Sequence, residues 1–304
     1  MRRVLDWISL RNVGRLVVLL LLGMIGRGAA RANPPGPPAV VGNSMLAKIF
    51  ARGVVRVGMC PGLTPFVVEG KAVEELAPLL DGAAIHPALS VDGRKLAGFD
   101  VELAAEVAKA LGARLEIVVV DSFEALLPGL VEGRYDFVAS GLTRTLQRAT
   151  KVAFSDPYFS SGIEVLVRDA KRHDTVAALN VPASRVAYRR GTTAELLVER
   201  RLDKVTRVPI ESREAIFAAF DDPTIAAVVA DTLVARDAEV RKRAKTVLTT
   251  LEDRRFSTEH LAIAVPLGEP DWLGWINLFL RESKSQGAFH RAAARYNAWF
   301  RTER

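Results

Sequence analysis

Buried, strand-like runs alternate with helix-like segments along this chain, and this alternation constrains its fold more than any other feature. The segment from Phe99 to Gly112, "FDVELAAEVAKALG", has apolar residues at helical spacing, with Asp100 placed to cap its start and a glycine at its end. The strand-like "RLEIVVVD", the helix-like "FEALLPGLVEG" and the strand-like "YDFVAS" follow. Strands and helices that alternate in this way predict parallel βαβ units in an α/β fold.

The same pattern returns in the second half of the chain. The segment "SRVAYRRGTTAELLVERRL" predicts a strand, a polar turn and a helix, "SREAIFAAF" a helix, "IAAVVAD" a buried strand ending at Asp231, and "HLAIAVP" one further strand. We expect two lobes, because a polar turn follows a strand once in each half; a single continuous sheet is the alternative. The predicted limits are residues 51–160 plus 264–304 for the first lobe and 161–263 for the second.

The first 32 residues have the features of an export signal. Arginines precede the apolar run Leu16 to Ile25, and Ala30-Arg31-Ala32 forms a small-x-small cleavage site. A membrane anchor is the alternative, but a spanning helix needs about 20 apolar residues, and Arg27 follows this run closely. We predict a signal peptide over residues 1–32, cleaved near Ala32, and a flexible proline-rich leader over residues 33–50.

Charge and composition exclude several classes of function. Residues 1–32 hold six arginines and one aspartate, so 36 of the 42 basic and 34 of the 35 acidic residues remain, with a net charge of +2. This balance gives no support to nucleic-acid binding. Cys60 is the only cysteine, which rules out an intramolecular disulfide, and the four histidines are scattered. With no hydrolase, phosphate-loop or metalloprotease motif, we expect no cofactor, metal or catalytic residue.

Hydroxyl and guanidinium groups follow the strand "YDFVAS", in "GLTRTLQR". In α/β sheets, ligands bind beyond the carboxyl ends of the strands. Hydroxyl donors and a guanidinium that can form two parallel hydrogen bonds suit a carboxylate, and a glycine lets the main chain approach closely. These residues predict an anion site.

Six segments, taken in order, resemble the periplasmic solute-binding proteins of ABC importers, in the polar amino-acid class. They are "GVVRVGMCPGLTPF", "LAGFDVELAAEVAKALG", "FEALLPGLVEGRYDFVASGLTRTLQR", "VAFSDPYFSSGIEVLV", "YRRGTTAE" and "VVAD". The resemblance implies a two-lobed, type II-like periplasmic binding fold with two doubly wound α/β sheets joined by a two-segment hinge. It also implies a periplasmic monomer that closes on a small ligand and delivers it to an ABC permease in the inner membrane.

The resemblance assigns roles to individual residues. The residues that it places on the ligand α-carboxylate are Ser140, Gly141, Thr143 and Arg148. Thr192 or Thr193 would add contacts from the second lobe, Asp231 would bind the α-ammonium group, and Phe123 would line the side-chain pocket.

Each of these polar residues also has a structural alternative. Thr143 and Thr145 could cap the next helix, and Arg148 could lie on a helix surface. Arg144 could face solvent or the rim of the pocket. Asp231 either caps the following helix or pairs with a bound cation, because an unpaired buried carboxylate is costly. Capping is also favoured for Asp100 over a contact with the ligand.

Two positions depart from the family pattern. Cys60 stands where the family often has an aspartate, and Leu63 stands where it often has an aromatic residue. The resemblance places both among the ligand-binding positions. Loss of the acid argues against a basic amino acid as ligand and favours a neutral or acidic one. The cysteine could be a reactive thiol near the cleft, although packing is favoured. Residues 69–95 are longer than the family's usual hairpin and could wall the cleft.

Two other functions fit the same scaffold. Cyclohexadienyl dehydratases share this fold and would need a general acid, for which Glu164 and Glu195 are candidates. A ligand-sensing module for a membrane receptor would use the same binding step. We favour the transport receptor over the enzyme. The segment "FSDPYF" and Asp231 fit recognition of an amine, and prephenate, a substrate of these dehydratases, lacks one.

Overall fold

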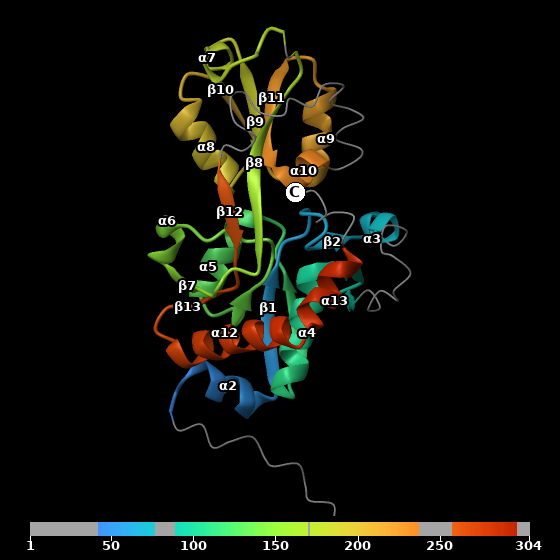
Figure 1. Ribbon diagram of the computed structural model, residues 1–304, viewed down its shortest axis with the longest axis vertical. Helices are drawn as coiled ribbons and strands as arrows, with labels where there is room; N and C mark the ends of the chain where they lie inside the picture. Colours follow the sequence, from blue (N-terminus) through green and yellow to red (C-terminus); the bar gives the residue numbers. More distant parts are fainter. Residues whose placement is uncertain (1–41, 77–88, 170, 237–256, 297–304) are drawn as a thin grey trace, which may run out of the picture. The chain divides into compact units, whose positions relative to one another are not determined.

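A computed structural model of the protein describes residues 42–76, 89–169, 171–236 and 257–296 (Figure 1). The predicted signal peptide lies outside the described residues, as does half of the predicted leader, residues 33–41. The described part contains two separate five-stranded sheets. The prediction of a two-lobed α/β fold is therefore confirmed, and a single continuous sheet is excluded. None of the described helices combines the length and the apolar character that a membrane span requires.

The first sheet has the strand order β5-β1-β6-β13-β7. Its strands are β1 (Val54–Met59), β5 (Arg114–Val119), β6 (Phe137–Val138), β7 (Val152–Phe154) and β13 (Ala264–Pro266). The pairs β1–β5 and β1–β6 are parallel, as the alternating pattern predicts, whereas β13 runs antiparallel to both of its neighbours.

Helices and one small sheet surround this first sheet. The helices are α2 (Met45–Arg52), α3 (Lys71–Leu76), α4 (Phe99–Leu111), the 3-10 helix η2 (Phe123–Ala125), α5 (Leu126–Val131), α6 (Leu146–Ala149), α12 (Pro270–Ser285) and α13 (Ala288–Arg295). The small sheet has the order β2-β4-β3, with β2 (Val68–Glu69), β3 (Leu89–Val91) and β4 (Arg94–Ala97).

The second sheet has the order β10-β9-β11-β8-β12. Its strands are β8 (Phe159–Val167), β9 (Arg185–Arg189), β10 (Thr206–Ile210), β11 (Ile225–Asp231) and β12 (Thr258–Leu261). Its helices are α7 (Val176–Leu179), α8 (Thr193–Arg201), α9 (Arg213–Asp221) and α10 (Thr232–Arg236).

Helices cover the second sheet on both faces, so this lobe is doubly wound (Figure 1). On β9, Val186 and Tyr188 belong to one apolar cluster with residues of α8. Ala187, which lies between them, belongs to a second cluster with residues of α9. Successive residues of a strand point to opposite faces of a sheet, so these two clusters lie on its two sides.

Two segments, β8 and β12, pair with each other antiparallel between residues 159–162 and 258–261. The predicted single strand "HLAIAVP" is divided between the sheets, with β12 in the second and β13 in the first. Between them, the backbone N–H of Ala262 donates to the Leu142 carbonyl, and that of Ile263 donates to Ser155 Oγ at 3.0 Å. The predicted lobe limits fall within β8 and between β12 and β13, and they remain a proposal.

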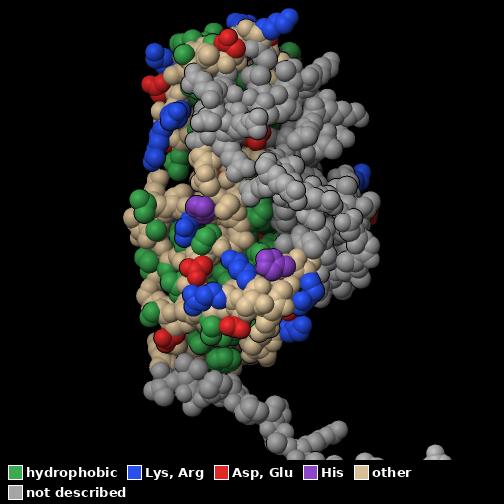
Figure 2. All heavy atoms as spheres, viewed as in Figure 1, with side chains coloured by type: hydrophobic (Ala, Val, Ile, Leu, Met, Phe, Trp, Pro, Cys, Tyr) green, Lys and Arg blue, Asp and Glu red, His purple; other side chains and the backbone are tan. Residues whose placement is uncertain are grey.

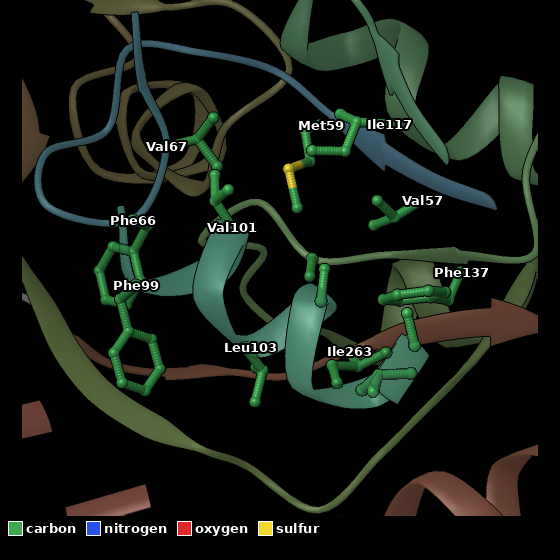
Figure 3. Packing of buried hydrophobic residues seen from close by; sticks show 14 of the residues in the cluster. Val57, Met59, Phe66, Val67, Phe99, Val101, Leu103, Ile117, Phe137 and Ile263 are labelled. Carbon is green, nitrogen blue, oxygen red and sulfur yellow. The ribbon is translucent and has the colours of Figure 1, made fainter. Parts of the chain in front are cut away.

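The core of the first lobe lies between β1 and the buried face of α4 (Figure 3). Val57 and Met59 on the strand are fully buried, as are Phe66 and Phe137. The apolar positions that predict an amphipathic helix from Phe99 onward therefore pack against this strand. The packing holds the carboxyl end of β1 in place.

The structure differs from the sequence prediction at the N-terminal edge. Residues 45–50, which are predicted to belong to a flexible leader, form most of α2, which Ser44 caps by accepting a hydrogen bond from the N–H of Ala47. Buried Met45 and Ile49 attach this helix to the core. In the 69–95 segment, β3 and β4 form a hairpin around Asp92 and α3 supplies a short helix, while residues 77–88 lie outside the described part.

Charged side chains of both signs are scattered over the face shown in Figure 2. No single-sign stripe crosses the coloured part of this view, in agreement with the small net charge outside residues 1–32.

Candidate functional site

A cavity lies where loops at the carboxyl ends of strands from both sheets meet. Its volume of about 60 Å³ is space for about five water molecules, so it suits a small organic molecule. The lining residues that the sequence predicts are Leu63, Phe123, Gly141, Thr143, Arg148, Thr192, Thr193 and Asp231. An apolar wall from the second lobe completes it, with Ile163, Ile216, Val229 and Val234.

Arg148 supplies a desolvated cation on the first-lobe side. Thr145 caps α6, as predicted, by accepting a hydrogen bond from the Arg148 N–H at 3.1 Å. The guanidinium donates to the carbonyls of Thr143 at 2.5 Å and Gly191 at 2.9 Å. Burial lowers its pKa to about 10, so the group stays protonated at neutral pH. It forms no ion pair with a carboxylate of the described residues, and a bound anion would supply one.

Gly141 shapes the floor of the cavity. Its φ of +59° lies in the left-handed region, and a Cβ at this position would collide with the side chain of Leu63. Its N–H donates to Asp100 Oδ2 at 2.6 Å, so that donor is already occupied. Asp100 also accepts from the Tyr158 hydroxyl at 2.9 Å. The expected capping role of Asp100 is wrong, because Gly98 is the N-cap of α4.

Two of the predicted residues do not line the cavity. The Ser140 hydroxyl accepts from the Cys60 N–H at 2.9 Å and donates to the Cys60 carbonyl at 3.0 Å. Ser140 therefore joins the ends of β1 and β6 behind the cavity wall. Cys60 itself is only 2% exposed, as favoured for a packing residue. Burial raises the pKa of its thiol, and Arg189 opposes this rise.

The start of α8 forms the second-lobe side of the cavity. Thr192 is the N-cap and Thr193 the first helical residue. The Thr192 hydroxyl donates to the Arg189 carbonyl at 2.7 Å, and Glu195 accepts from the Gly191 N–H at 2.8 Å. The first turn of a helix carries unpaired N–H groups and a partial positive charge. The turn is therefore suited to an anion.

Asp231 supplies the acidic group. Its Oδ1 accepts from the Ser161 hydroxyl and from the Leu233 N–H, both at 2.8 Å. It therefore bonds to the first turn of α10, as the capping alternative predicts, and it also lines the cavity. Its pairing with a bound cation stays a prediction. Burial raises its pKa to about 6, with smaller contributions from the neighbouring Glu259 and Glu164, while the hydrogen bonds from Leu233 and Ser161 oppose the rise.

Arg189 lines the cavity and was missed by the sequence analysis. It ends β9, immediately before the polar turn that leads into α8. Its guanidinium carbon lies 5.5 Å from the centre of the Phe123 ring, and that of Arg148 lies 5.8 Å from the same ring. Its position at the end of a predicted strand could have identified it, because ligands bind at the carboxyl ends of such strands.

Asp100 makes the stability of the protein depend on pH. Burial raises its pKa from 3.8 to about 7. The folded state therefore holds this proton more tightly than the unfolded state, and the stabilisation is full below about pH 4 and lost as pH rises to about 7. We expect the free energy of unfolding of wild type, relative to that of Asp100→Asn, to fall by a few kcal/mol over this interval.

Urea unfolding of both proteins at several pH values measures this difference. Asp92→Asn is the control, because Asp92 lies exposed in the turn between β3 and β4. Parallel stability curves for wild type and Asp100→Asn would contradict the prediction.

Comparison with known proteins gives a consistent result. Residues 83–301 match the bacterial extracellular solute-binding proteins, family 3. The L-cystine-binding protein TcyJ of Escherichia coli K12 is 29% identical over 264 residues, covering 82% of this chain and 93% of that protein. A putative binding component of an ABC transporter from Wolinella succinogenes, solved with lysine, is 26% identical with a TM-score of 0.66, covering 82% of this chain and 96% of that one.

An enzyme is also among the relatives. Cyclohexadienyl dehydratase of Pseudomonas aeruginosa is 29% identical over 142 residues, but these cover 46% of this chain and 53% of the enzyme. The general-acid candidates Glu164 and Glu195 are not among the described residues that line the cavity. The family is one of binding proteins, in agreement with the sequence prediction that this protein is not an enzyme. Because the family match extends over most of the chain, this protein belongs to the bacterial extracellular solute-binding proteins, family 3.

Proposed function

We propose that this protein captures a small α-amino acid in the cavity between its lobes and delivers it to the permease of an ABC transporter. It acts as a monomer in the periplasm, after its signal peptide has been cleaved near Ala32. The names of its relatives support a ligand of this class, because one is a cystine-binding protein and another was solved with lysine. Cystine and lysine share an α-carboxylate and an α-ammonium group.

One observation carries the proposal. The cavity combines a desolvated cation of the first lobe, Arg148, with a half-buried carboxylate of the second lobe, Asp231. An α-amino acid has the two charges that complement them. The hydroxyl of Thr143, the first turn of α8 and the Arg148 guanidinium would hold the α-carboxylate, and Asp231 would hold the ammonium group.

This division of the ligand between lobes couples binding to closure. Only contacts that differ between an open and a closed state can shift the equilibrium between them. A ligand held by Arg148 and Asp231 together gains its full set of contacts only when the lobes meet. The mechanism is therefore ligand-dependent closure about β8 and β12.

A thermal-shift panel on the protein lacking residues 1–32, unfolded and refolded to remove carried-over ligand, tests the proposal. The panel contains the common amino acids, their amides, ornithine, small dicarboxylates and prephenate. A ligand at about a thousand times its dissociation constant adds roughly 4 kcal/mol to the stability. In a protein of this size that raises the melting temperature by on the order of ten degrees.

Two results would decide against an amino-acid receptor. One is a shift with prephenate or another amine-free acid and none with any α-amino acid; turnover of prephenate would then support the dehydratase alternative. The other is co-purification with a sensor kinase instead of a permease, which would support the sensing role.

A further inference from the structure

We infer that the cavity is selective for an α-amino acid with a second carboxylate on its side chain, and that Arg189 selects it. This inference rests on the proposed function and deepens it, because it names the class of side chain. The sequence favours a neutral or acidic ligand; the structure provides a specific reason for the acidic one.

The first step is the charge of the cavity. Of the described residues that line it, Arg148 and Arg189 are cations, and Asp231 alone carries a carboxylate. The first turn of α8 adds partial positive charge. An α-amino acid with a neutral side chain would pair one carboxylate with Arg148 and its ammonium group with Asp231. Arg189 would then have no carboxylate partner within this cavity.

The second step is the bonding of Arg189. Its guanidinium donates to the Glu211 carbonyl at 3.2 Å, to Cys60 Sγ at 3.3 Å and to the Pro61 carbonyl at 3.2 Å. All three acceptors are uncharged, and Arg189 forms no ion pair with a described residue. A half-buried cation with only neutral acceptors gains most from a carboxylate, because charge-assisted bonds are roughly twice as strong as neutral ones.

The two guanidiniums reach one aromatic ring from different lobes. Both pack against the ring of buried Phe123. The electron-rich face of the ring attracts each guanidinium and helps to hold it in place. Because Arg148 comes from α6 of the first lobe and Arg189 from β9 of the second, they form two distinct anion positions at one apolar ring. A dicarboxylate can occupy both, whereas a side-chain cation would meet Arg189 with like charge.

A latch between the lobes is the competing role for Arg189. Pro61 and Cys60 follow β1 of the first lobe, so their bonds to Arg189 link the two lobes without any ligand. A latch would change the closure equilibrium for every ligand equally. A selectivity residue would change the affinity for the dicarboxylates alone. The comparison of an acid with its isosteric amide separates these two roles.

The test measures the dissociation constants of L-glutamate, L-aspartate, L-glutamine and L-asparagine by titration calorimetry at pH 7.5. The protein is again the refolded chain lacking residues 1–32. Three proteins are compared: wild type, Arg189→Gln and Arg190→Gln. Arg190 is the matched control, because it is the next residue, is exposed, and pairs with Glu211 at 3.2 Å.

We expect wild type to bind one of the two acids about 100-fold more tightly than its amide. Arg189→Gln should weaken binding of that acid roughly 10- to 100-fold and leave the amides within about threefold. Arg190→Gln should behave as wild type. If Arg189→Gln fails to fold, Arg189→Lys replaces it; this variant keeps the positive charge and should retain part of the preference for the acid.

Three outcomes would overturn the inference. They are an equal loss for acid and amide in the variant, a wild-type protein that binds the amides as tightly as the acids, and a preference for a basic amino acid. If another α-amino acid binds and binding requires Arg148 and Asp231, the proposed function stands and the inference alone fails. If no α-amino acid binds, both fail.

Discussion

Replacing Arg148 by glutamine should abolish amino-acid binding at micromolar ligand concentrations. Removing one partner of a buried, hydrogen-bonded charge pair costs about 2–5 kcal/mol, which is a loss of roughly 30- to 4000-fold in affinity. Arg148 lies at the upper end of this range, because its guanidinium is desolvated and has no carboxylate partner among the described residues. Without it, the ligand α-carboxylate would lose its charged donor in a desolvated part of the cavity.

Calorimetric titration with the ligand found in the panel measures the effect, with Arg144→Gln as the matched control. Arg144 is four residues away and exposed, and it does not line the cavity, so its loss should leave affinity unchanged. Arg148→Lys should retain only part of the wild-type affinity, because an ammonium group lacks the planar pair of donors that a guanidinium offers to a carboxylate. An affinity of Arg148→Gln within about threefold of wild type would mean that the carboxylate binds elsewhere.

Much of the site could be predicted from sequence, because its polar residues are of types that bind ligands and lie at positions where ligands bind. Thr143, Arg148 and Asp231 each follow a buried strand, and ligands gather at those strand ends. These polar side chains come at or after the end of an apolar run, so a binding role was the simplest explanation. Residue type and position indicated an anion site after β6, the family resemblance assigned the individual roles, and the structure brings these three residues to one cavity.

Contacts between distant segments could not be predicted in this way. Asp100 has a typical position for a capping residue, but Gly98 caps the helix and leaves the carboxylate free to reach Gly141 and Tyr158. Ser140 resembles a ligand donor in sequence, yet its hydroxyl forms hydrogen bonds with the backbone of Cys60. Both outcomes depend on which segments meet in three dimensions.

The predicted limits of one strand and one helix were wrong for a related reason. The apolar run "HLAIAVP" predicts one strand, but it divides because its central N–H groups bond to Leu142 and Ser155 in the first lobe. The sequence from Trp272 to Phe300 predicts continuous helix, but the φ of +72° at Gly287 separates α12 from α13. A periodic pattern indicates the type of an element more reliably than its limits.

Asp231 should make binding of the amino acid weaken as pH falls below about 6. Burial raises the pKa of this carboxylate to about 6, and only the ionised form can pair with the ligand ammonium group. Protons therefore compete with the ligand, and wild-type affinity should fall about tenfold between pH 7.5 and pH 5. The α-carboxyl and α-ammonium groups of the ligand do not titrate in this interval.

Asp231→Asn should bind roughly 100-fold more weakly than wild type at pH 7.5 and should lose the tenfold step, so that the two affinities approach each other at pH 5. Calorimetric titrations of both proteins across the interval measure this convergence. Asp100 titrates nearby, but it is present in both proteins and cancels from their ratio. Glu259 and Glu164 are likewise unchanged. A ratio of affinities that stays constant from pH 7.5 to pH 5 would show that Asp231 does not hold the ammonium group, because its protonation would then leave binding unaffected.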